Sequence, residues 1–407
     1  MNFKNYIRNE FGKTDTPENT IRNIVTGFEK LGYDIQYMPF QFSDQIHWSG
    51  ICINSINLEC QGKGLTPLLS KASAHAELAE RFSGGLFFQA FEEQVRFNMP
   101  ALYSREVNRF LNFEWLDGYV NSHQDSLKTE YLSIETLLSS QSHLFSKDIE
   151  EIKNSQIARH WVNGYSIMQD KNVKVPINFI AYISASNGMA AGNTLEEAII
   201  QATCEVFERY TQIQIIKPEQ TIPTIDINTL KNERLKSMIA FYENENVEII
   251  LKDFSMCGQF PSIGVLFINH NLRIGRLEHK ILMPGVSFNL EEALSRCLTE
   301  YMQGRRTLKT SRPDMDRPVI HRSRISNFYQ LFKCCVSQKD ISFLEKGDTI
   351  AFRDSINGDI LSEIEAIKKL CRDLDTSHRF GPHPSGTGIP RSSSCNARLF
   401  GLSSICS

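Results

Sequence analysis

The sequence lacks a hydrophobic run long enough to cross a membrane. Its longest apolar stretches, such as Ile263 to Ile268, have the length of a strand, whereas a membrane-spanning helix needs about 20 apolar residues. Residues 1–10 contain no apolar run either, so the sequence does not predict a signal peptide. We therefore expect a cytoplasmic protein without a membrane partner.

The ten cysteines lack the spacing of a metal site or of a redox pair. None of them form a C-x-x-C motif, and Cys204 and Cys297 fall within predicted helices. The adjacent residues Cys334 and Cys335 would make a poor chelate and a strained disulfide. We interpret all ten as reduced thiols of a cytosolic protein.

A strong net charge is also missing. The 407 residues include 44 basic and 47 acidic side chains, which leaves a net charge of −3. Bulk electrostatics therefore give no reason to bind nucleic acid or an anionic membrane. The composition, 41% hydrophobic and 22% charged, is typical of a soluble globular protein.

No linker rich in proline or glycine interrupts the chain between residues 46 and 374. We predict one cooperative domain over residues 46–376, with residues 1–45 as an N-terminal helix and strand region of the same domain. Residues 377–407 differ, because they are rich in Pro, Gly, Ser and Arg and show neither alternation nor a helical period. They predict either a disordered tail or a tail produced by a frame disruption.

The expected elements repeat the order strand, loop and acidic helix three times. This order predicts an α+β fold of sheets with packed helices, with an α/β arrangement as the alternative. A further polar and mostly helical region is expected over residues 90–155. The expected helices are 17–31, 67–82, 195–212, 290–304 and 359–374, and the expected strands are 33–38, 48–56, 177–183, 247–252, 263–268 and 280–288.

Three of these helices carry the same acidic pattern at the same distance from their start. In each, the first glutamate lies 11 residues past the capping residue, which is about three turns at roughly 3.6 residues per turn. The next polar residue follows three positions later and so shares a face with it. The three sets are Glu77, Glu80 and Arg81, then Glu205, Glu208 and Arg209, and finally Glu300, Gln303 and Arg305.

A capping residue specifies the start of each acidic helix. Thr66 can cap the first helix, with Pro67 at the first helical position. The other two starts fit capping boxes, which pair Thr194 with Glu197 and Asn289 with Glu292. These caps set the register, and therefore the face that each glutamate occupies.

The repeated carboxylates predict a cation site. Two carboxylates three residues apart in an apolar helix repel each other, and their burial is costly unless a cation compensates. Arg81 and Arg209 can offset only part of that charge. Mg²⁺ is the expected ion, because it prefers carboxylates together with phosphate oxygens. A single E-x-x-E-R motif usually marks a solvated helix face, but two copies in one register and a third variant favour a functional site.

Two short turns could complete such a site. Gly62-Lys63-Gly64 comes before a helix N-terminus, where it could offer backbone donors and one ammonium group to an anion. Ser186-Asn187-Gly188 comes before the second acidic helix. Both segments are also compatible with ordinary turns. Ser73 lies one turn before Glu77 on the same face and could equally be a small packing residue.

These segments resemble, in order, the three signatures of the YcaO family. The first is Gly62-Lys63-Gly64 with Ser73 to Arg81, the second runs from Ser186 to Tyr210 and contains S-N-G-M-A-A-G-N-T, and the third is Thr299 to Arg305. The match extends from about residue 46 to residue 305. The S-N-G-M-A-A-G-N-T segment is most similar to that of the stand-alone bacterial members, rather than to that of the azoline-forming cyclodehydratases.

The resemblance implies ATP-dependent activation of a peptide or protein backbone amide. A nucleophile adds to the amide carbon, the γ-phosphate of ATP passes to the amide oxygen, and loss of phosphate leaves an azoline, thioamide or amidine. The resemblance implies catalytic roles for Glu77, Glu205 and Arg209. It implies Mg²⁺ binding by Glu77, Glu80, Glu205 and Glu208, and nucleotide binding by Lys63, Ser73, Arg81, Asn187, Glu300, Gln303 and Arg305.

The resemblance to stand-alone members also implies a homodimer and a link to methylthiolation of a small-subunit ribosomal protein, with a RimO-like enzyme as the possible partner. A partner of this kind could recruit the substrate. One alternative is a nucleotide-binding accessory factor without chemistry of its own. A metal-dependent nuclease is disfavoured, because the net charge of −3 suggests no basic surface.

Overall fold

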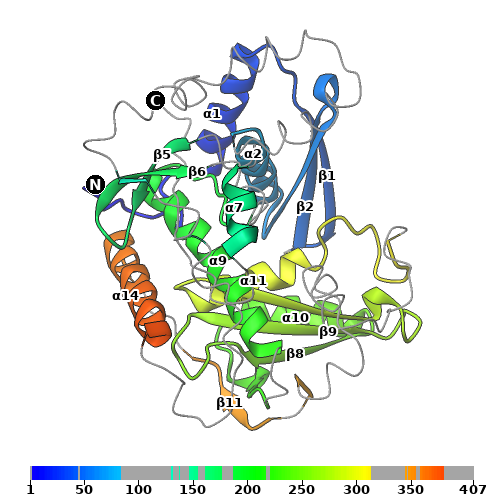
Figure 1. Ribbon diagram of the computed structural model, residues 1–407. Coiled ribbons are helices and arrows are strands. Elements are labelled where there is room, and N and C mark those ends of the chain that lie inside the picture. The colour runs from blue at the N-terminus through cyan, green and yellow to red at the C-terminus, as the bar shows by residue number, and fades with distance from the viewer. Residues whose placement is uncertain are drawn as a thin grey trace. The chain divides into compact units, whose positions relative to one another are not determined.

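The computed structural model describes residues 2–44, 46–83, 130–131, 137, 146–154, 161–176, 187–216, 221–312, 344–345, 347–353 and 358–379. Figure 1 shows the chain as a ribbon coloured from the N-terminus to the C-terminus. The described residues divide into two units. Unit 1 comprises the described residues of 1–14, 79–206 and 360–407, and unit 2 those of 15–78 and 207–359.

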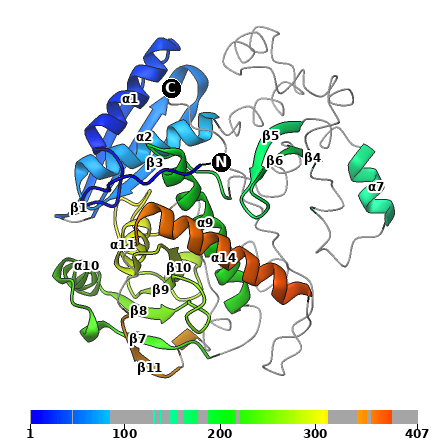
Figure 2. The ribbon, with the colours of Figure 1, turned by 90° about the vertical axis from the view of Figure 1, so that its left-hand side faces the viewer.

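Unit 2 contains a five-stranded sheet in the order β10-β9-β8-β7-β11 (Figure 2). Neighbouring strands are antiparallel except β11, which runs parallel to β7. The strands are β7 (Thr224–Asp226), β8 (Val247–Asp253), β9 (Ser262–Asn269), β10 (Lys280–Val286) and β11 (Thr349–Ala351).

Both faces of strand β9 are buried. Along β9, Val265 and Phe267 belong to the core cluster that includes residues of α10 (Glu233–Asn244) and α11 (Leu290–Glu300). The alternate residue Leu266 packs in a second cluster with residues of other elements. The two-residue period of a strand thus distributes the side chains of β9 between two cores.

A second sheet in unit 2 has the antiparallel order β1-β2-β3. Helix α11 contacts β2 and β3 of this sheet as well as β9 and β10 of the five-stranded sheet. It therefore joins the two sheets of unit 2. The remaining elements that begin in this unit are α1 (Pro17–Lys30), β1 (Gln36–Ser43), β2 (Ile46–Ile53), β3 (Leu58–Gly64) and α2 (Pro67–Ser83), with one-turn 3₁₀ helices at Asn54–Ile56, Ile227–Thr229 and Leu277–His279.

Strand β3 lies very close to α2. A Cβ atom built on Gly62 would lie 2.0 Å from the backbone nitrogen of Ala74, and one built on Gly64 would lie 2.5 Å from the backbone nitrogen of Ser70. The prediction that Gly62-Lys63-Gly64 forms a turn is wrong, because these residues end β3 and pair with β2. Their glycines serve the close packing of a strand against a helix.

Unit 1 contains a small sheet in the order β4-β6-β5, together with α7 and α14 and the first part of α9. Figure 2 shows α14 in orange. Tyr165 of β5 makes an edge-to-face contact with Phe3, at 6.1 Å between ring centroids, and belongs to a core with Ile199 of α9. The elements are β4 (Glu130–Tyr131), α7 (Ser146–Asn154), β5 (Trp161–Ser166), β6 (Lys171–Pro176), α9 (Leu195–Ile216) and α14 (Ile360–Arg379).

The expected α+β fold is confirmed, and most element boundaries move by a few residues. The helix expected over 195–212 continues to Ile216, whereas the one expected over 290–304 ends at Glu300. The tail predicted from residue 377 begins within α14, and residues 380–407 lie outside the described residues. So do the strand expected over 177–183 and most of the region 90–155. The hairpin of β5 and β6 was not predicted.

The described part of the chain contains six free cysteines and no candidate membrane span. Its six cysteines are free thiols, as predicted, whereas Cys334, Cys335, Cys395 and Cys406 lie outside it. A search of the same residues finds no helix with the length and hydropathy that a bilayer crossing requires.

We predict that Gly62→Ala destabilises the protein by about 3 kcal/mol or more, because the added methyl group meets backbone atoms that cannot move independently of α2. Urea unfolding monitored by circular dichroism measures this change. Gly27→Ala is the matched control, since Gly27 is exposed in α1 and a Cβ there meets nothing within 4 Å. That control should stabilise the protein by about 0.5–1 kcal/mol. Equal stability of Gly62→Ala and wild type would contradict the close packing.

Candidate functional site

The three predicted capping residues all cap their helices. The Thr66 hydroxyl accepts a hydrogen bond from the Leu69 backbone N–H at 3.1 Å. The Thr194 hydroxyl accepts one from the Glu197 backbone N–H at 3.2 Å. Asn289 Oδ1 accepts hydrogen bonds from the first backbone N–H groups of α11. The register of each acidic segment is therefore fixed at its first turn.

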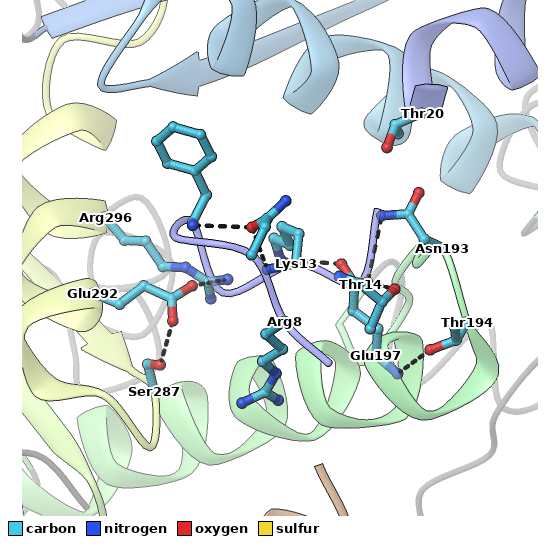
Figure 3. A network of polar contacts seen from close by, with 12 residues as sticks. Arg8, Lys13, Thr14, Thr20, Asn193, Thr194, Glu197, Ser287, Glu292 and Arg296 are labelled. Atoms are coloured by element: carbon cyan, nitrogen blue, oxygen red, sulfur yellow. Dashed lines mark hydrogen bonds and ion pairs between the residues drawn. The ribbon is translucent and has the colours of Figure 1, made fainter. Parts of the chain in front are cut away.

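The Glu197 carboxylate also holds the N-terminal segment of unit 1, as Figure 3 shows. Its Oε2 accepts hydrogen bonds from the Thr14 hydroxyl at 2.7 Å and from the Thr14 backbone N–H at 3.3 Å. Asn193 Nδ2 donates to the same oxygen at 3.4 Å, and Lys13 Nζ lies 3.4 Å from Oε1. A carboxylate of the first turn of α9 thus fixes a segment almost 200 residues away in sequence.

Two further contacts attach the N-terminal segment within unit 1. The Lys4 backbone N–H donates to Glu196 Oε1 at 2.7 Å. Arg8 forms a bidentate pair with Glu363 of α14, at 2.6 and 2.5 Å. The segment therefore contacts the start of α9, which carries Glu205 two to three turns further on.

Several predicted site residues meet within unit 2. Lys63 Nζ of β3 donates to Glu300 Oε2 at the end of α11, at 2.6 Å. The Lys63 backbone N–H donates to the Ser73 hydroxyl at 3.4 Å, and Gln303 Nε2 donates to the Gln61 carbonyl at 3.1 Å. Segments that are far apart in the sequence therefore bring four predicted residues together.

A residue of α9, Arg209, also affects the Glu300 carboxyl through its charge. Burial by itself would raise the pKa of the Glu300 carboxyl, but the charge and hydrogen bond of Lys63, followed by the charges of Arg209 and Arg296, hold that pKa below its ordinary value. Arg209 also lies 3.7 Å from Glu208 and hydrogen-bonds to Gln212 at 3.5 Å. Lys63 thus contacts the Glu300 carboxylate, and the charges of two arginines also favour its ionised form.

Arg296 was not among the predicted residues. It lies four positions before Glu300 in α11, a spacing that places both side chains on one helix face. Its guanidinium forms an ion pair with Glu292 at 3.2 Å, and Glu292 accepts a hydrogen bond from Ser287 at 3.0 Å (Figure 3). The signal in the sequence was the i, i+4 spacing rather than the E-x-x-E-R pattern.

Gln303 is not helical, contrary to the predicted helix 290–304, because α11 ends at Glu300. Arg305 is only 2% exposed, and its Nη2 lies 2.9 Å from Glu278, which is fully buried. Its Nε donates to the Tyr301 carbonyl at 2.8 Å, and its own carbonyl accepts from Trp48 Nε1 at 2.8 Å. The structure therefore gives Arg305 a packing role, and its contact with phosphate stays a prediction.

In unit 1, the predicted turn at Asn187 and Gly188 is confirmed, whereas Ser186 lies outside the described residues. Gly188 has a φ of +86°, and its backbone N–H donates to Glu205 Oε2 at 3.3 Å. The Asn187 Oδ1 atom is buried and has no hydrogen-bond partner among the described residues. An acceptor left in this state fits a donor supplied by a ligand.

The predicted magnesium ligands are divided between the units. Glu77 and Glu208 belong to unit 2, and Glu80 and Glu205 belong to unit 1. Each is half-buried, as is Arg81. Within the described ranges, no three acidic, histidine or cysteine side chains are grouped so that they could hold a metal ion. Carboxylates are the ligand type that Mg²⁺ prefers, but the four-glutamate set stays a prediction.

Comparisons with known sequences agree with this combination of motifs. A family model described as YcaO cyclodehydratase, ATP- and Mg²⁺-binding, matches residues 61–376. An uncharacterized protein of Haemophilus influenzae is 28% identical over 305 residues, which are 72% of this chain and 49% of that protein. The ribosomal protein S12 methylthiotransferase accessory factor YcaO of Escherichia coli is 28% identical over 304 residues, with the same two shares. The chain thus spans about half the length of these curated relatives.

Two solved structures share the fold. A heterocyclase in complex with substrate and cofactor has a TM-score of 0.59 at 15% identity, covering 92% of this chain and 51% of its own. YcaO from Methanopyrus kandleri, bound with AMPPCP and Mg²⁺, has a TM-score of 0.53 at 17% identity, covering 90% and 84%. The family description confirms the predicted cofactors, ATP and Mg²⁺.

We predict that Lys63→Met raises the pKa of Glu300, because the effect of burial is then opposed only by the charges of Arg209 and Arg296. The ordinary pKa of a glutamate carboxyl is 4.5, and the pKa of Glu300 in the folded protein is lower. In the wild type, the ionised carboxylate therefore stabilises the fold fully above pH 4.5, and this stabilisation is lost as the pH falls through the folded-state pKa. Carbon-13 NMR of the Glu300 carboxyl measures the change. Lys236→Met, which removes a partner of exposed Glu233, should leave the Glu300 pKa unchanged. An unaltered pKa in Lys63→Met would refute the assignment.

We also predict that Glu197→Gln lowers the free energy of unfolding by about 1–2 kcal/mol, because hydrogen bonds to a charged acceptor are stronger than those to an amide. Hydrogen exchange of the Thr14 amide should accelerate at the same time. Glu233→Gln is the control, since that side chain is 83% exposed. Unchanged exchange at Thr14 would show that Glu197 does not hold the N-terminal segment.

Proposed function

Because the chain belongs to the YcaO family, we propose that it is an ATP- and Mg²⁺-dependent enzyme that activates a backbone amide of a peptide or protein. The family match covers residues 61–376, which contain all three signature segments. In the proposed reaction a nucleophile adds to the amide carbon, and the amide oxygen takes the γ-phosphoryl group of ATP as ADP leaves. Elimination of phosphate then completes the substitution at carbon.

The observation that carries this proposal is the cluster around Glu300. Lys63 from β3, Arg209 from α9 and Glu300 from α11 belong to three separate motifs; Lys63 hydrogen-bonds to Glu300, and the charge of Arg209 lowers the pKa of the same carboxyl. Phosphoryl transfer depends mainly on positioning and on neutralisation of phosphate charge. Lys63 and Arg209 would supply positive charge to the phosphates, while Glu300 keeps Lys63 in place when no phosphate is bound.

The other predicted residues take complementary roles. Glu77, Glu80, Glu205 and Glu208 are the proposed ligands of Mg²⁺, which supplies Lewis-acid stabilisation of the phosphates when bound. Asn187 would accept a hydrogen bond from the nucleotide or from a bound water, since its Oδ1 is a buried acceptor without a partner in the described part of the chain. Ser73, Arg81 and Gln303 complete the proposed pocket.

The proposed substrate is a protein rather than a free amino acid. The relative from Escherichia coli is named as an accessory factor for ribosomal protein S12 methylthiotransferase, and one structural neighbour is a heterocyclase with its substrate. We propose that this chain supports methylthiolation of a small-subunit ribosomal protein with a RimO-like partner. A cytoplasmic location and a homodimer belong to the same proposal.

A second candidate function is a nucleotide-binding accessory factor without catalysis. The name of the Escherichia coli relative favours it, because that protein is called an accessory factor. The two functions differ in ATP turnover. A catalyst should hydrolyse ATP or transfer its γ-phosphate when the peptide is present. A non-catalytic factor should bind ATP without turning it over, and should only raise the activity of its partner enzyme.

We predict that Glu205→Gln reduces ATP turnover by roughly a hundredfold or more, because the variant removes a charged ligand where phosphate charge develops. Turnover is measured as phosphate release at saturating Mg²⁺, and circular dichroism verifies that the variant is folded. Glu233→Gln, far from the signature motifs in sequence and exposed, should turn over ATP at the wild-type rate. Wild-type turnover by Glu205→Gln would count decisively against the proposed role.

A further inference from the structure

Glu278 is a fully buried carboxylate that lies outside the three signature segments, in the short 3₁₀ helix before β10. We propose that it is a positioning residue of the nucleotide site: it acts through Arg305 on the turn that follows α11, and so sets the place of Gln303. This inference rests on the proposed function. It gives Arg305 an indirect part in the site instead of a contact with phosphate.

Both oxygens of the Glu278 carboxylate contact the segment that follows α11. Oε1 lies 2.9 Å from Arg305 Nη2 and accepts a hydrogen bond from Arg312 Nε at 2.7 Å. Oε2 accepts a hydrogen bond from the Arg312 backbone N–H at 2.8 Å. One carboxylate therefore holds both ends of the segment from Arg305 to Arg312.

The charge of Glu278 matters because Arg305 is buried as well. The Arg305 side chain is 2% exposed, so water compensates little of its charge. Among the described residues, Glu278 is the carboxylate that forms an ion pair with it. A buried charge that loses its partner is strongly destabilising, and the side chain escapes this cost only by moving toward solvent. The place of the Arg305 guanidinium therefore depends on Glu278.

Arg305 in turn fixes the shape of the turn that begins where α11 ends. Its Nε donates to the Tyr301 carbonyl at 2.8 Å, and its backbone N–H donates to the Met302 carbonyl at 2.9 Å. Its own carbonyl accepts a hydrogen bond from Trp48 Nε1 of β2 at 2.8 Å. The turn from Tyr301 to Arg305 is thus closed on itself and attached to the three-stranded sheet.

Gln303 lies in this turn and connects it to β3. Its Nε2 donates to the Gln61 carbonyl at 3.1 Å, two positions before Lys63, whose Nζ donates to Glu300 at 2.6 Å. The turn approaches the strand closely, because a Cβ built on Gly304 would lie 2.9 Å from Gln61 Oε1. A shift of the turn therefore separates Gln303 from Gln61 and disturbs the strand segment that carries Lys63.

Glu278→Gln tests the positioning role, because it removes the charge of the carboxylate and keeps its shape. The side-chain amide of Gln303 reports the result, since its nitrogen-15 NMR signal depends on the hydrogen bond to the Gln61 carbonyl. We expect this signal to move toward that of a solvent-exposed glutamine. The dissociation constant of Mg²⁺-ATP, measured by isothermal titration, should rise about tenfold. A wild-type Gln303 signal or a wild-type dissociation constant in the folded variant would overturn the proposal.

Lys252→Met is the matched control for loss of a buried charge. Lys252 is fully buried in β8 of the same unit, and its Nζ donates to the Ile222 carbonyl at 2.9 Å and to the Thr224 hydroxyl at 2.7 Å. This variant should keep the wild-type Gln303 signal and affinity for Mg²⁺-ATP. Changes as large as those of Glu278→Gln would reduce the effect to general destabilisation and refute the proposal. Absence of Mg²⁺-ATP binding by the wild type would refute the proposed function, whereas equal binding by wild type and Glu278→Gln refutes this inference alone.

The double variant Glu278→Gln/Arg305→Met covers the case in which Glu278→Gln does not fold. It leaves no fully buried guanidinium of this cluster without a partner, because Arg312 is 33% exposed, and replacement of a buried ion pair by neutral side chains is often neutral for stability. The support of the turn by Arg305 is still lost, so we expect the Gln303 signal to shift and the affinity for Mg²⁺-ATP to fall. A wild-type Gln303 signal would overturn the proposal, and together with lost affinity it would assign Arg305 to the phosphate directly.

Discussion

The ion pair between Lys63 and Glu300 is the contact on which the candidate site depends. It joins β3 of the three-stranded sheet to the last residue of α11, and α11 also packs on β9 and β10 of the five-stranded sheet. The Lys63 and Glu300 side chains are 23% and 36% exposed, so solvent screens the pair in part. Its importance is therefore positional. It places a cation and a carboxylate where Arg209 and Arg296 also act.

A second charged group, which is fully buried, supports the end of α11. Glu278 is inaccessible to solvent and faces both Arg305 and Arg312, at 2.9 and 2.7 Å. Loss of one partner from such a group is costly, because it leaves a charge unsatisfied in a medium of low dielectric constant. Arg305 also lies over the Tyr301 ring, with its guanidinium carbon 4.5 Å from the ring centroid. The turn after α11 is thus fixed by charges that face inward, while Glu300 faces the site.

The sequence predicted the features that depend on local chemistry. Thr66, Thr194 and Asn289 cap the helices as expected, because a cap requires only a polar side chain and the next turn. It could not predict features that depend on distant neighbours. Gly62 ends a strand rather than a turn because α2 returns against it, and Arg305 is buried because Glu278 lies across from it. A pattern of residue types carries no information on either partner.

The signature segments contain both glycines and charged residues. The glycines set the backbone that positions the charged side chains, which explains why the two kinds of residue occur together. Gly62 and Gly64 allow β3 to approach α2 so closely that no larger residue fits, and this approach sets the position of Lys63 between them. Gly188 adopts a positive φ and directs its N–H to Glu205. In each case a glycine sets the backbone and a charged residue next to it, or hydrogen-bonded to it, provides the chemistry. A glycine in these motifs is therefore as necessary to the proposed phosphate site as the charge that it positions.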